Sequence, residues 1–318
     1  MGKFATVMKF PKILSIFFIF SLFLACNSSE EKKISKNLLP KKEDTKTITP
    51  RTVSNEFREY WYSGKAEITS YALMQERYGE IREGIAVNIF VTEDFLPNEQ
   101  VKANNTSTEN ISVLKLNQMK NFNTGIYPYS IMTSAFSPIS TTDHALKVNN
   151  SVQEWCGQVY MQLNNRNNFE IESHSYFQGE ADQNLTLPKT WLENELWNLV
   201  RINPEELPTG DIMIIPSFEY LRLRHKEIKE HNAFASLKQG DSITIYTLNY
   251  PDLQRQLMLF FHSTFPYEIE KWEEVNAADQ NDTLRLKTTA IKMKRMRSAY
   301  WKENGNDSAH LRDSLGLR

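Results

Sequence analysis

The sequence contains little cysteine, little glycine and no excess of charge of either sign, and each scarcity excludes a class of protein. With 2 cysteines in 318 residues, disulfides cannot replace a hydrophobic core. The 11 glycines include neither a Walker phosphate loop nor a Gly-x-Ser-x-Gly elbow. The 37 basic and 39 acidic side chains nearly balance, which excludes a nucleic-acid binder held by clustered phosphate contacts. No nucleic-acid partner is therefore expected.

Long apolar runs are also missing, and the apolar segment at the N-terminus is too short to span a bilayer. Ile13–Ala25 carries no charge and follows a stretch that contains Lys3, Lys9 and Lys12. A transmembrane helix needs about 20 apolar residues, whereas the apolar part of a secretion signal needs about 7–15. This pattern predicts a cleaved signal peptide over residues 1–26.

The signal ends in a motif that resembles the lipobox of bacterial lipoproteins. The motif is Leu22–Cys26, with Phe23 where Leu is more usual. The resemblance implies that a diacylglycerol is attached to the Cys26 sulfur, and several acyl chains at about 0.8 kcal/mol per buried CH₂ anchor a soluble body to a membrane. Asn27, in place of Asp, implies the outer membrane by the sorting rule of such lipoproteins. Ser28–Glu31 resembles an export signal to the cell surface but is equally a polar linker, so periplasmic and surface-facing positions both stay open.

The rest of the chain divides by composition into a tether and a body. Residues 27–54 are too poor in apolar side chains to offset the entropy lost on ordering. We interpret them as a flexible tether that spans roughly 30 Å. Residues 55–318 then form a β-rich body, most simply one domain with a polar C-terminal tail.

Alternating apolar and polar residues predict many strands in this body. The clearest are Ile85–Val91, Val159–Leu163 and Phe169–His174, and the last two flank the polar turn Asn165–Asn168. The same reasoning predicts strands at Asp211–Ile215, Phe218–Leu223, Ile243–Thr247, Leu257–Phe261 and Leu284–Met293. No regular alternation of strand and helix occurs. The predicted fold is therefore mainly β, an antiparallel sandwich or a curved half-barrel.

One short helix is expected to flank this sheet. Thr190 and Glu193 have the spacing of a capping box, and apolar residues follow at helical spacing: Leu192, Leu196, Leu199 and Val200. These features predict a helix over about residues 190–201. A shorter helix is expected at Asn55–Tyr62.

The cysteine that remains after lipidation permits two interpretations. Cys156 has no second cysteine to pair with, so it cannot form an internal disulfide. It is either a nucleophile that needs a nearby histidine or a small apolar side chain packed beside Trp155. The packing role is the simpler one.

A second candidate combines acids and a histidine. Glu170, Glu172 and His174 would share one face of a strand, with Glu180 close by in the chain. The three side chains on that face could ligate a metal or perform acid–base chemistry. A hydrolase in this region would use Glu172, His174 and Glu180 or Cys156. The same side chains could instead form the solvated face of a hairpin, and we favour this interpretation. No catalytic residue, cofactor or metal is therefore assigned.

A short basic stretch near the C-terminus also permits two interpretations. It comprises Lys292, Lys294, Arg295 and Arg297. Lysines protect exposed edge strands from unwanted pairing. The alternative is a contact with an acidic glycan or a lipid head group.

Several segments resemble an uncharacterised family of bacterial envelope lipoproteins, across most of the chain after Ser54. They are Trp61–Ile68, Arg77–Glu80, Phe90–Phe95, Asn121–Ser130 and Gln153–Gly157. Members of this family can carry the label "septum formation inhibitor Maf". Maf-type nucleotide pyrophosphatases are cytosolic α/β proteins with an N-terminal Ser-rich, Arg-Arg motif, and that motif is absent here. The resemblance implies an envelope lipoprotein and brings no catalytic residues.

Two functional hypotheses follow from the sequence. The first is a lipid-anchored binding or structural module for a glycan, a lipid or a partner protein of the envelope. A deep apolar pocket would favour a lipid, and a shallow groove edged by Trp and Tyr would favour a glycan. The alternative is an envelope hydrolase that uses the region of Cys156, Glu172 and His174, which requires these groups to converge in a cleft.

Overall fold

The computed structural model describes residues 47–277 and 285–317. The expected signal peptide (1–26), Cys26 and most of the expected tether lie outside the described residues. Contacts within the chain divide it into residues 1–42 and residues 43–318, and every described residue belongs to the second unit.

Sixteen strands join into one sheet within this unit. Their bounds are β1 Ala66–Arg77, β2 Glu80–Leu96, β3 Val101–Lys102, β4 Ile111–Thr124, β5 Tyr127–Pro138, β6 Lys147–Glu154, β7 Gly157–Asn165, β8 Phe169–Ser175, β9 Asp182–Leu187, β10 Trp191–Leu192, β11 Gly210–Ile215, β12 His231–Lys238, β13 Ile243–Tyr250, β14 Arg255–His262, β15 Ile269–Val275 and β16 Lys287–Ser298. The helices are α1 Asn55–Trp61, α2 Glu193–Ile202, α3 Phe218–Leu223 and α4 Leu311–Ser314, with short 3-10 turns η1 Pro204–Glu206, η2 Tyr300–Lys302 and η3 Asn306–His310.

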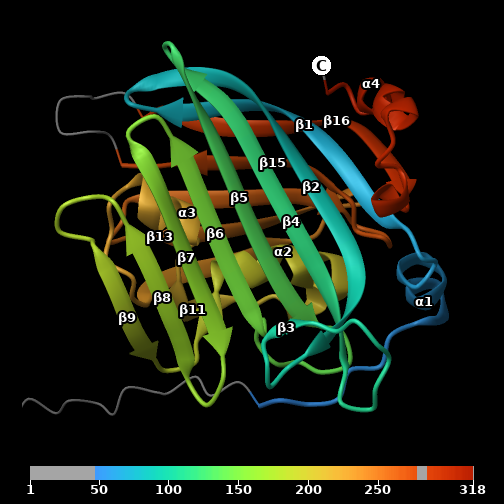
Figure 1. Cartoon of the computed structure of the whole chain (residues 1–318). Coiled ribbons are helices and arrows are strands. Elements are labelled where there is room, and N and C mark those ends of the chain that lie inside the picture. Colours follow the sequence, from blue (N-terminus) through green and yellow to red (C-terminus); the bar gives the residue numbers. More distant parts are fainter. Residues whose placement is uncertain (1–46, 278–284, 318) are drawn as a thin grey trace, which may run out of the picture. The chain divides into compact units, whose positions relative to one another are not determined.

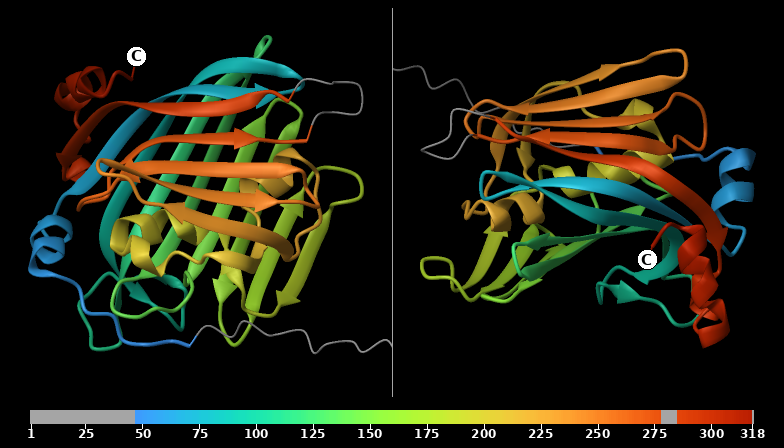
Figure 2. Two further views of the ribbon diagram at one scale, coloured as in Figure 1. Left: turned by 180° about the vertical axis from the view of Figure 1, so that it is seen from behind. Right: turned by 90° about the horizontal axis from the view of Figure 1, so that it is seen from above.

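The strands follow the order β10-β11-β12-β13-β14-β15-β16-β1-β2-β4-β5-β6-β7-β8-β9, with β3 beside β2. The short β10 pairs parallel to β11, and the long neighbouring strands, such as β1 with β2 and with β16, pair antiparallel. The pairing of β16 with β1 joins the C-terminal half of the sheet to the N-terminal half. The sheet curls without closing into a barrel, and α2 and α3 lie between its two halves (Figures 1 and 2). This mainly β, curved and open sheet confirms the predicted fold class.

The predicted alternation holds in the clearest strands. In β8 the buried side chains are Phe169, Ile171 and Ser173, and the exposed ones are Glu170, Glu172 and His174. The first set faces the inner side of the curled sheet, where the main core lies. The period of two therefore separates a core face from a solvent face, as it does in half-buried antiparallel strands.

Helix α2 starts later than predicted, and its cap is different. Leu192 is the N-cap residue, and the Glu195 carboxylate accepts a hydrogen bond from the Leu192 N–H at 3.2 Å. The Thr190 hydroxyl instead donates to a β11 carbonyl oxygen at 2.6 Å. The predicted capping box of Thr190 and Glu193 is wrong because strand β10 keeps this part of the chain extended.

The sequence predicts a strand at Phe218–Leu223, but these residues form α3, so this prediction is wrong. The Ser217 hydroxyl accepts a hydrogen bond from the Tyr220 N–H at 3.2 Å. The Asn194 side chain, from α2, accepts one from the Phe218 N–H at 3.3 Å. These two oxygens satisfy N–H groups that a helix start leaves free. A short segment rich in apolar residues fits both periods, so its pattern alone does not decide the structure.

The end of the expected tether lies against the body. Pro50 forms an isolated β-bridge with Thr141. The buried Arg51 guanidinium forms an ion pair with Glu206 at 2.5 Å and donates to the Pro138 carbonyl at 2.7 Å. Residues 47–54 therefore make specific contacts with the part of the chain predicted to be the body.

Candidate functional site

The inner side of the curled sheet is occupied by α2 and α3. Every residue of both helices is buried, and their apolar side chains share one core with both halves of the sheet. Two bidentate ion pairs tie α2 to the strands, Arg201 to Glu67 and Arg255 to Glu193, with distances of 2.5–2.8 Å. Burial alone would raise the pKa of Glu67, but the Arg201 guanidinium holds that pKa below its usual value.

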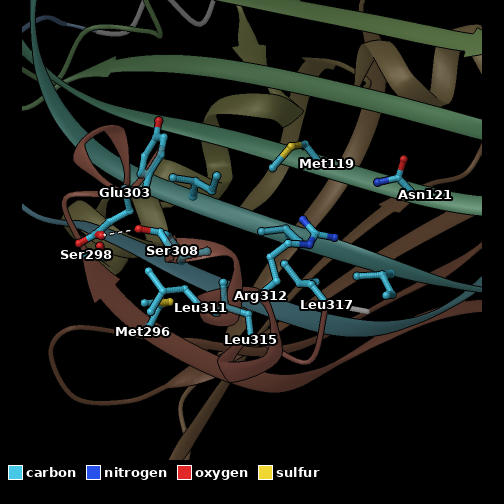
Figure 3. Close-up of a pocket in the computed structure, with 15 residues that line it drawn as sticks. Met119, Asn121, Met296, Ser298, Glu303, Ser308, Leu311, Arg312, Leu315 and Leu317 are labelled. Carbon is cyan, nitrogen blue, oxygen red and sulfur yellow. Dashed lines mark hydrogen bonds between the residues drawn. The ribbon is translucent and has the colours of Figure 1, made fainter. Parts of the chain in front are cut away.

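An apolar pocket of about 470 Å³ lies on the opposite, outer face of the sheet, beneath the C-terminal segment (Figure 3). Its volume falls within the range of about 300–1,000 Å³ that is usual for ligand sites. Strands β1, β2, β4 and β16 form the floor, with Ile68, Ile85, Val87, Ile89, Met119, Asn121, Met296 and Ser298. The C-terminal segment forms the roof, with Tyr300, Glu303, Ser308, Leu311, Arg312, Leu315 and Leu317.

The floor explains an unusual feature of β2. The inner face of this strand carries Ala86, Asn88 and Phe90, while the more strongly apolar series Ile85, Val87, Ile89 and Val91 faces outward. These outward residues form a second, smaller cluster with Leu315 of the roof. The apolar stripe of β2 is therefore not solvent-exposed, because the C-terminal segment covers it.

The roof is held by this apolar contact and by a hydrogen bond from a side chain of β1. Leu315 is 6% exposed, and its carbonyl oxygen accepts a hydrogen bond of 2.5 Å from the Ser70 hydroxyl. Within the roof, Ser308 donates to the Glu303 carboxylate at 3.1 Å. Burial raises the pKa of the Tyr300 hydroxyl, and the carboxylate of Glu93 adds to this rise. The predicted polar tail thus has an apolar face that the sequence analysis missed.

The pocket combines apolar walls with a few polar groups. Glu303, Arg312 and Asn121 are the long polar side chains in its lining (Figure 3). Arg312 is exposed and forms no ion pair with a carboxylate in the described part of the chain. Such an arrangement suits a ligand with an apolar chain and a polar or anionic end.

The residues predicted as a polar cluster lie in different environments. Cys156 is an exposed, free thiol in the turn between β6 and β7. The Glu154 carboxylate raises its pKa by hydrogen bonding and by charge, which disfavours the reactive thiolate. This environment corresponds to neither interpretation of Cys156, because the side chain is neither buried nor activated.

Glu172 and His174 belong to the outer, solvated face of β8. Both side chains are exposed, and His174 makes an exposed contact with Asp182 at 3.2 Å. Ser173, which lies between them in the strand, faces inward and lines a pocket other than the outer-face pocket. Cys156, Glu172 and His174 therefore do not converge in a cleft.

Glu180 shows no hydrogen bond to Cys156, Glu172 or His174 in the described chain and pairs with a histidine that the sequence analysis did not select. Its carboxylate binds the His225 Nδ1 and accepts a hydrogen bond of 2.5 Å from the Ser175 hydroxyl. Glu180 and His225 line a pocket of about 280 Å³ between β7, β8 and the segment after α3. A nucleophile relay would need the hydroxyl on the imidazole, whereas here both groups bind the carboxylate. No local pattern links residues this far apart in the chain.

One group of metal-ligating side chains occurs in the described residues, and it is neutralised by lysine and arginine. His262, Glu268 and Glu270 place one ligand atom each within 4.8 Å of one another. Lys292 forms ion pairs with both glutamates, and Arg295 forms one with Glu268 at 2.9 Å. Burial would raise the pKa of Glu270, but hydrogen bonds from Lys292 and His262 lower it. These carboxylates are therefore already compensated by cations of the chain.

The same contacts show that the basic stretch in β16 does not protect an exposed edge strand. Strand β16 lies between β15 and β1 and is not an edge of the sheet. Lys292 and Arg295 serve the ion pairs just described, and Arg297 donates to the Ser63 hydroxyl at 2.6 Å. Edge protection is therefore the wrong explanation for these residues.

Comparisons with known proteins identify no family for this chain. No family model matches it, and no curated protein matches its sequence. A solved structure described as a beta-barrel-like protein of the domain of unknown function DUF1849 from Brucella abortus aligns with 73% of this chain and 98% of its own, at 7% identity and a TM-score of 0.39. Among the helices of the described part, none has the length and apolar character that a membrane span requires.

Proposed function

We propose that this protein is a lipid-anchored binding module of the bacterial cell envelope, and that the outer-face pocket binds a ligand with an acyl chain. The observation that carries the proposal is the pocket itself, whose floor and roof are mostly aliphatic and thioether side chains. An acyl chain buried there gains roughly 0.8 kcal/mol per CH₂ group. The exposed Arg312 at the pocket suits an anionic or polar head group.

The proposed location rests on the sequence. The lipobox-like motif at Cys26 supports an anchor in the outer membrane, and the residues after it leave a periplasmic and a surface-facing body equally open. An acyl-binding pocket fits this location because acylated lipids are the main apolar ligands at a membrane. Hydrolase activity is not proposed, since the candidate polar residues do not meet in a cleft. Nucleotide pyrophosphatase activity is not proposed either, because the Maf-type motif is absent from the sequence.

A pocket-filling substitution tests the acyl-binding proposal. Met119→Trp places a large ring in the floor of the pocket. Met132→Trp is a matched control, because Met132 is the direct cross-strand partner of Met119 on β5 and is exposed outside the pocket. We expect the wild-type protein and the control to bind a fluorescent fatty acid equally, and Met119→Trp to bind it at least tenfold more weakly.

Two results would contradict the proposal. One is equal binding by Met119→Trp and Met132→Trp. The other is the absence of saturable binding by the wild-type chain in the same titration. Circular dichroism of all three proteins shows whether the fold is retained, and native mass spectrometry of the wild-type protein reports any acyl ligand that copurifies.

A further inference from the structure

Four turns lie along one end of the sheet, well separated in sequence. They connect β1 to β2, β4 to β5, β6 to β7 and β8 to β9 (Figure 1). Because these strands are antiparallel neighbours in the order β1-β2-β4-β5-β6-β7-β8-β9, every second turn falls at the same end. We call this set the hairpin end.

The hairpin end carries the most exposed large apolar side chains of the described residues. They are Ile126 at 85%, Tyr176 at 73% and Trp155 at 68% exposure. The Trp155 ring stacks near Tyr127, with centroids 6.1 Å apart, and the exposed Tyr78 lies in the turn between β1 and β2. Exposed aromatic rings that gather at one place mark binding surfaces.

Beneath these turns lie two buried arginines that form no ion pair in the described part of the chain. Four described arginines are buried, namely Arg77, Arg201, Arg222 and Arg255. Arg201 and Arg255 each form a bidentate ion pair with a buried glutamate. Arg77 and Arg222 form no ion pair, although they are only 6% and 1% exposed.

The bonds of Arg77 lead to neutral groups. It donates to the Leu223 carbonyl at 2.6 Å and to the hydroxyls of Tyr78 and Tyr129 at 3.0 and 3.2 Å. Its Nε is buried without a hydrogen-bond partner. The Tyr78 ring, which is exposed, lies over the guanidinium with its centroid 4.1 Å from Cζ.

Arg222 makes fewer hydrogen bonds than Arg77. Its only hydrogen-bond contact in the described chain is between Nη1 and the His225 Nε2 at 3.5 Å, and its Nε has none. The Phe177 ring covers it, with the centroid 3.9 Å from Cζ. Burial lowers the pKa of Arg222, the nearby Glu180 opposes this shift, and the charge of Arg77 lowers the pKa further. The two cations are thus close enough to repel each other.

The backbone at this end is strained at the same positions. Tyr78, Ala181 and His225 have φ values of 56°, 49° and 49°. Non-glycine residues rarely adopt this left-handed region, and such residues concentrate at binding sites and mobile turns. Two buried cations without a direct ion pair, only partly offset at Arg222 by Glu180, and strained covering turns together cost stability. An anion bound between the arginines would reduce this cost.

From these observations, we infer that the hairpin end is a binding site for an acidic saccharide. Arg77 and Arg222 receive its carboxylate or phosphate group once the covering rings of Tyr78 and Phe177 move aside. The exposed rings of Trp155 and Tyr176 pack against the apolar faces of neighbouring sugar rings. A saccharide fits better than an acidic protein segment, because exposed amide side chains share this end with the rings, and a protein contact would need a continuous apolar centre. These amides are Asn123, Gln153, Gln158 and Gln178.

The test is a calorimetric titration of the full-length protein in detergent with a short oligogalacturonate. A neutral oligosaccharide of similar length is the ligand control. We expect saturable binding of the acidic oligomer only, weakening as salt is raised. Arg222→Met and Trp155→Ala should each weaken it at least tenfold. Trp301→Ala is the matched control, because Trp301 is also an exposed tryptophan but lies in the C-terminal segment, and it should bind like the wild type.

Three outcomes would overturn the inference. The first is no binding of the acidic oligomer by the wild-type protein. The second is binding that neither Trp155→Ala nor Tyr176→Ala changes, which is decisive even if Arg222→Met fails to fold, because both of these side chains are exposed. The third is equally tight, Arg222-dependent binding of a polyglutamate peptide, which would assign the site to an acidic protein. The Met119→Trp variant should bind the oligogalacturonate normally, so this site and the acyl pocket can fail separately.

Discussion

At the scale of single residues, the four buried arginines of the described chain fall into two kinds: Arg201 and Arg255 pair with a buried glutamate, and Arg77 and Arg222 form no ion pair there. Arg201 neutralises Glu67, which is fully buried and also accepts a hydrogen bond from the Tyr60 hydroxyl. Arg222 has no such partner. Removing one member of a buried ion pair leaves the other charge buried without a partner. Removing a buried charge that has no ion pair leaves no such charge behind.

This difference predicts opposite effects of the same substitution. Arg201→Met should lower the free energy of unfolding by about 3–5 kcal/mol, because Glu67 would remain buried and charged. Arg222→Met should leave it within about 1 kcal/mol of the wild type or raise it, because the substitution removes a buried cation that has no direct ion-pair partner. Chemical denaturation of both variants measures the two values. A loss for Arg222→Met as large as that for Arg201→Met would show that Arg222 holds the fold.

The residue scale is also where the sequence was least informative about a site. Glu180 was selected with His174 because they are near in sequence, yet its carboxylate binds His225, far along the chain. Arg77 and Arg222 lie near enough to repel each other because α3 packs under the β1–β2 turn, where Arg77 donates to the Leu223 carbonyl. Contacts of this kind depend on the packing of distant elements, which residue spacing does not encode.

At the scale of elements, the outer pocket depends on how the C-terminal segment attaches to the sheet. Leu315 is the buried residue of that segment and contacts the outward apolar side chains of β1 and β2. Leu315→Ala should lower the free energy of unfolding by about 2 kcal/mol, the lower end of the range for buried leucines, because the site lies near the surface. The same variant should bind the fluorescent fatty acid more weakly.

A control for this variant is Ile126→Ala, since Ile126 is an exposed apolar residue in the β4–β5 turn and should change neither property. Thermal unfolding and the fatty-acid titration of both variants provide the comparison. Unchanged stability and unchanged binding in Leu315→Ala would mean that the segment does not form the roof in solution.

The elements themselves were largely predictable where one face is buried and the other solvated. The strands at Ile85–Val91, Val159–Leu163 and Phe169–His174 were all found. The helix predicted at Asn55–Tyr62 was also found and ends one residue earlier, at Trp61. The strand prediction failed at Phe218–Leu223, where oxygens of Ser217 and Asn194 decide for a helix. One of those oxygens comes from another helix, so local propensity was overruled by tertiary contacts.

At the scale of the whole molecule, strand order is the property that the sequence could not supply. Turns join neighbours such as β7 and β8, and polar turn residues reveal them. No turn joins β16 to β1, whose pairing connects Ser298 to Ala66 across most of the chain. That pairing places the C-terminal segment on the outer face of β1 and β2. The candidate pocket is therefore a consequence of long-range topology and lay beyond any local pattern.

The proposed lipid anchor also concerns the whole molecule, and the two cysteines of the chain allow a matched test of it. If Cys26 carries the lipid, Cys26→Ala should move the protein from the membrane fraction to the soluble fraction, because the acyl chains contribute about 0.8 kcal/mol per buried CH₂ to membrane binding. Cys156→Ala should leave the protein in the membrane fraction, since Cys156 is a free thiol in a turn of the body. Immunoblots of fractionated cells measure both. Retention of Cys26→Ala in salt-washed membranes would contradict the anchor, whereas its release with an unchanged circular dichroism spectrum would separate the anchor from the folding of the body.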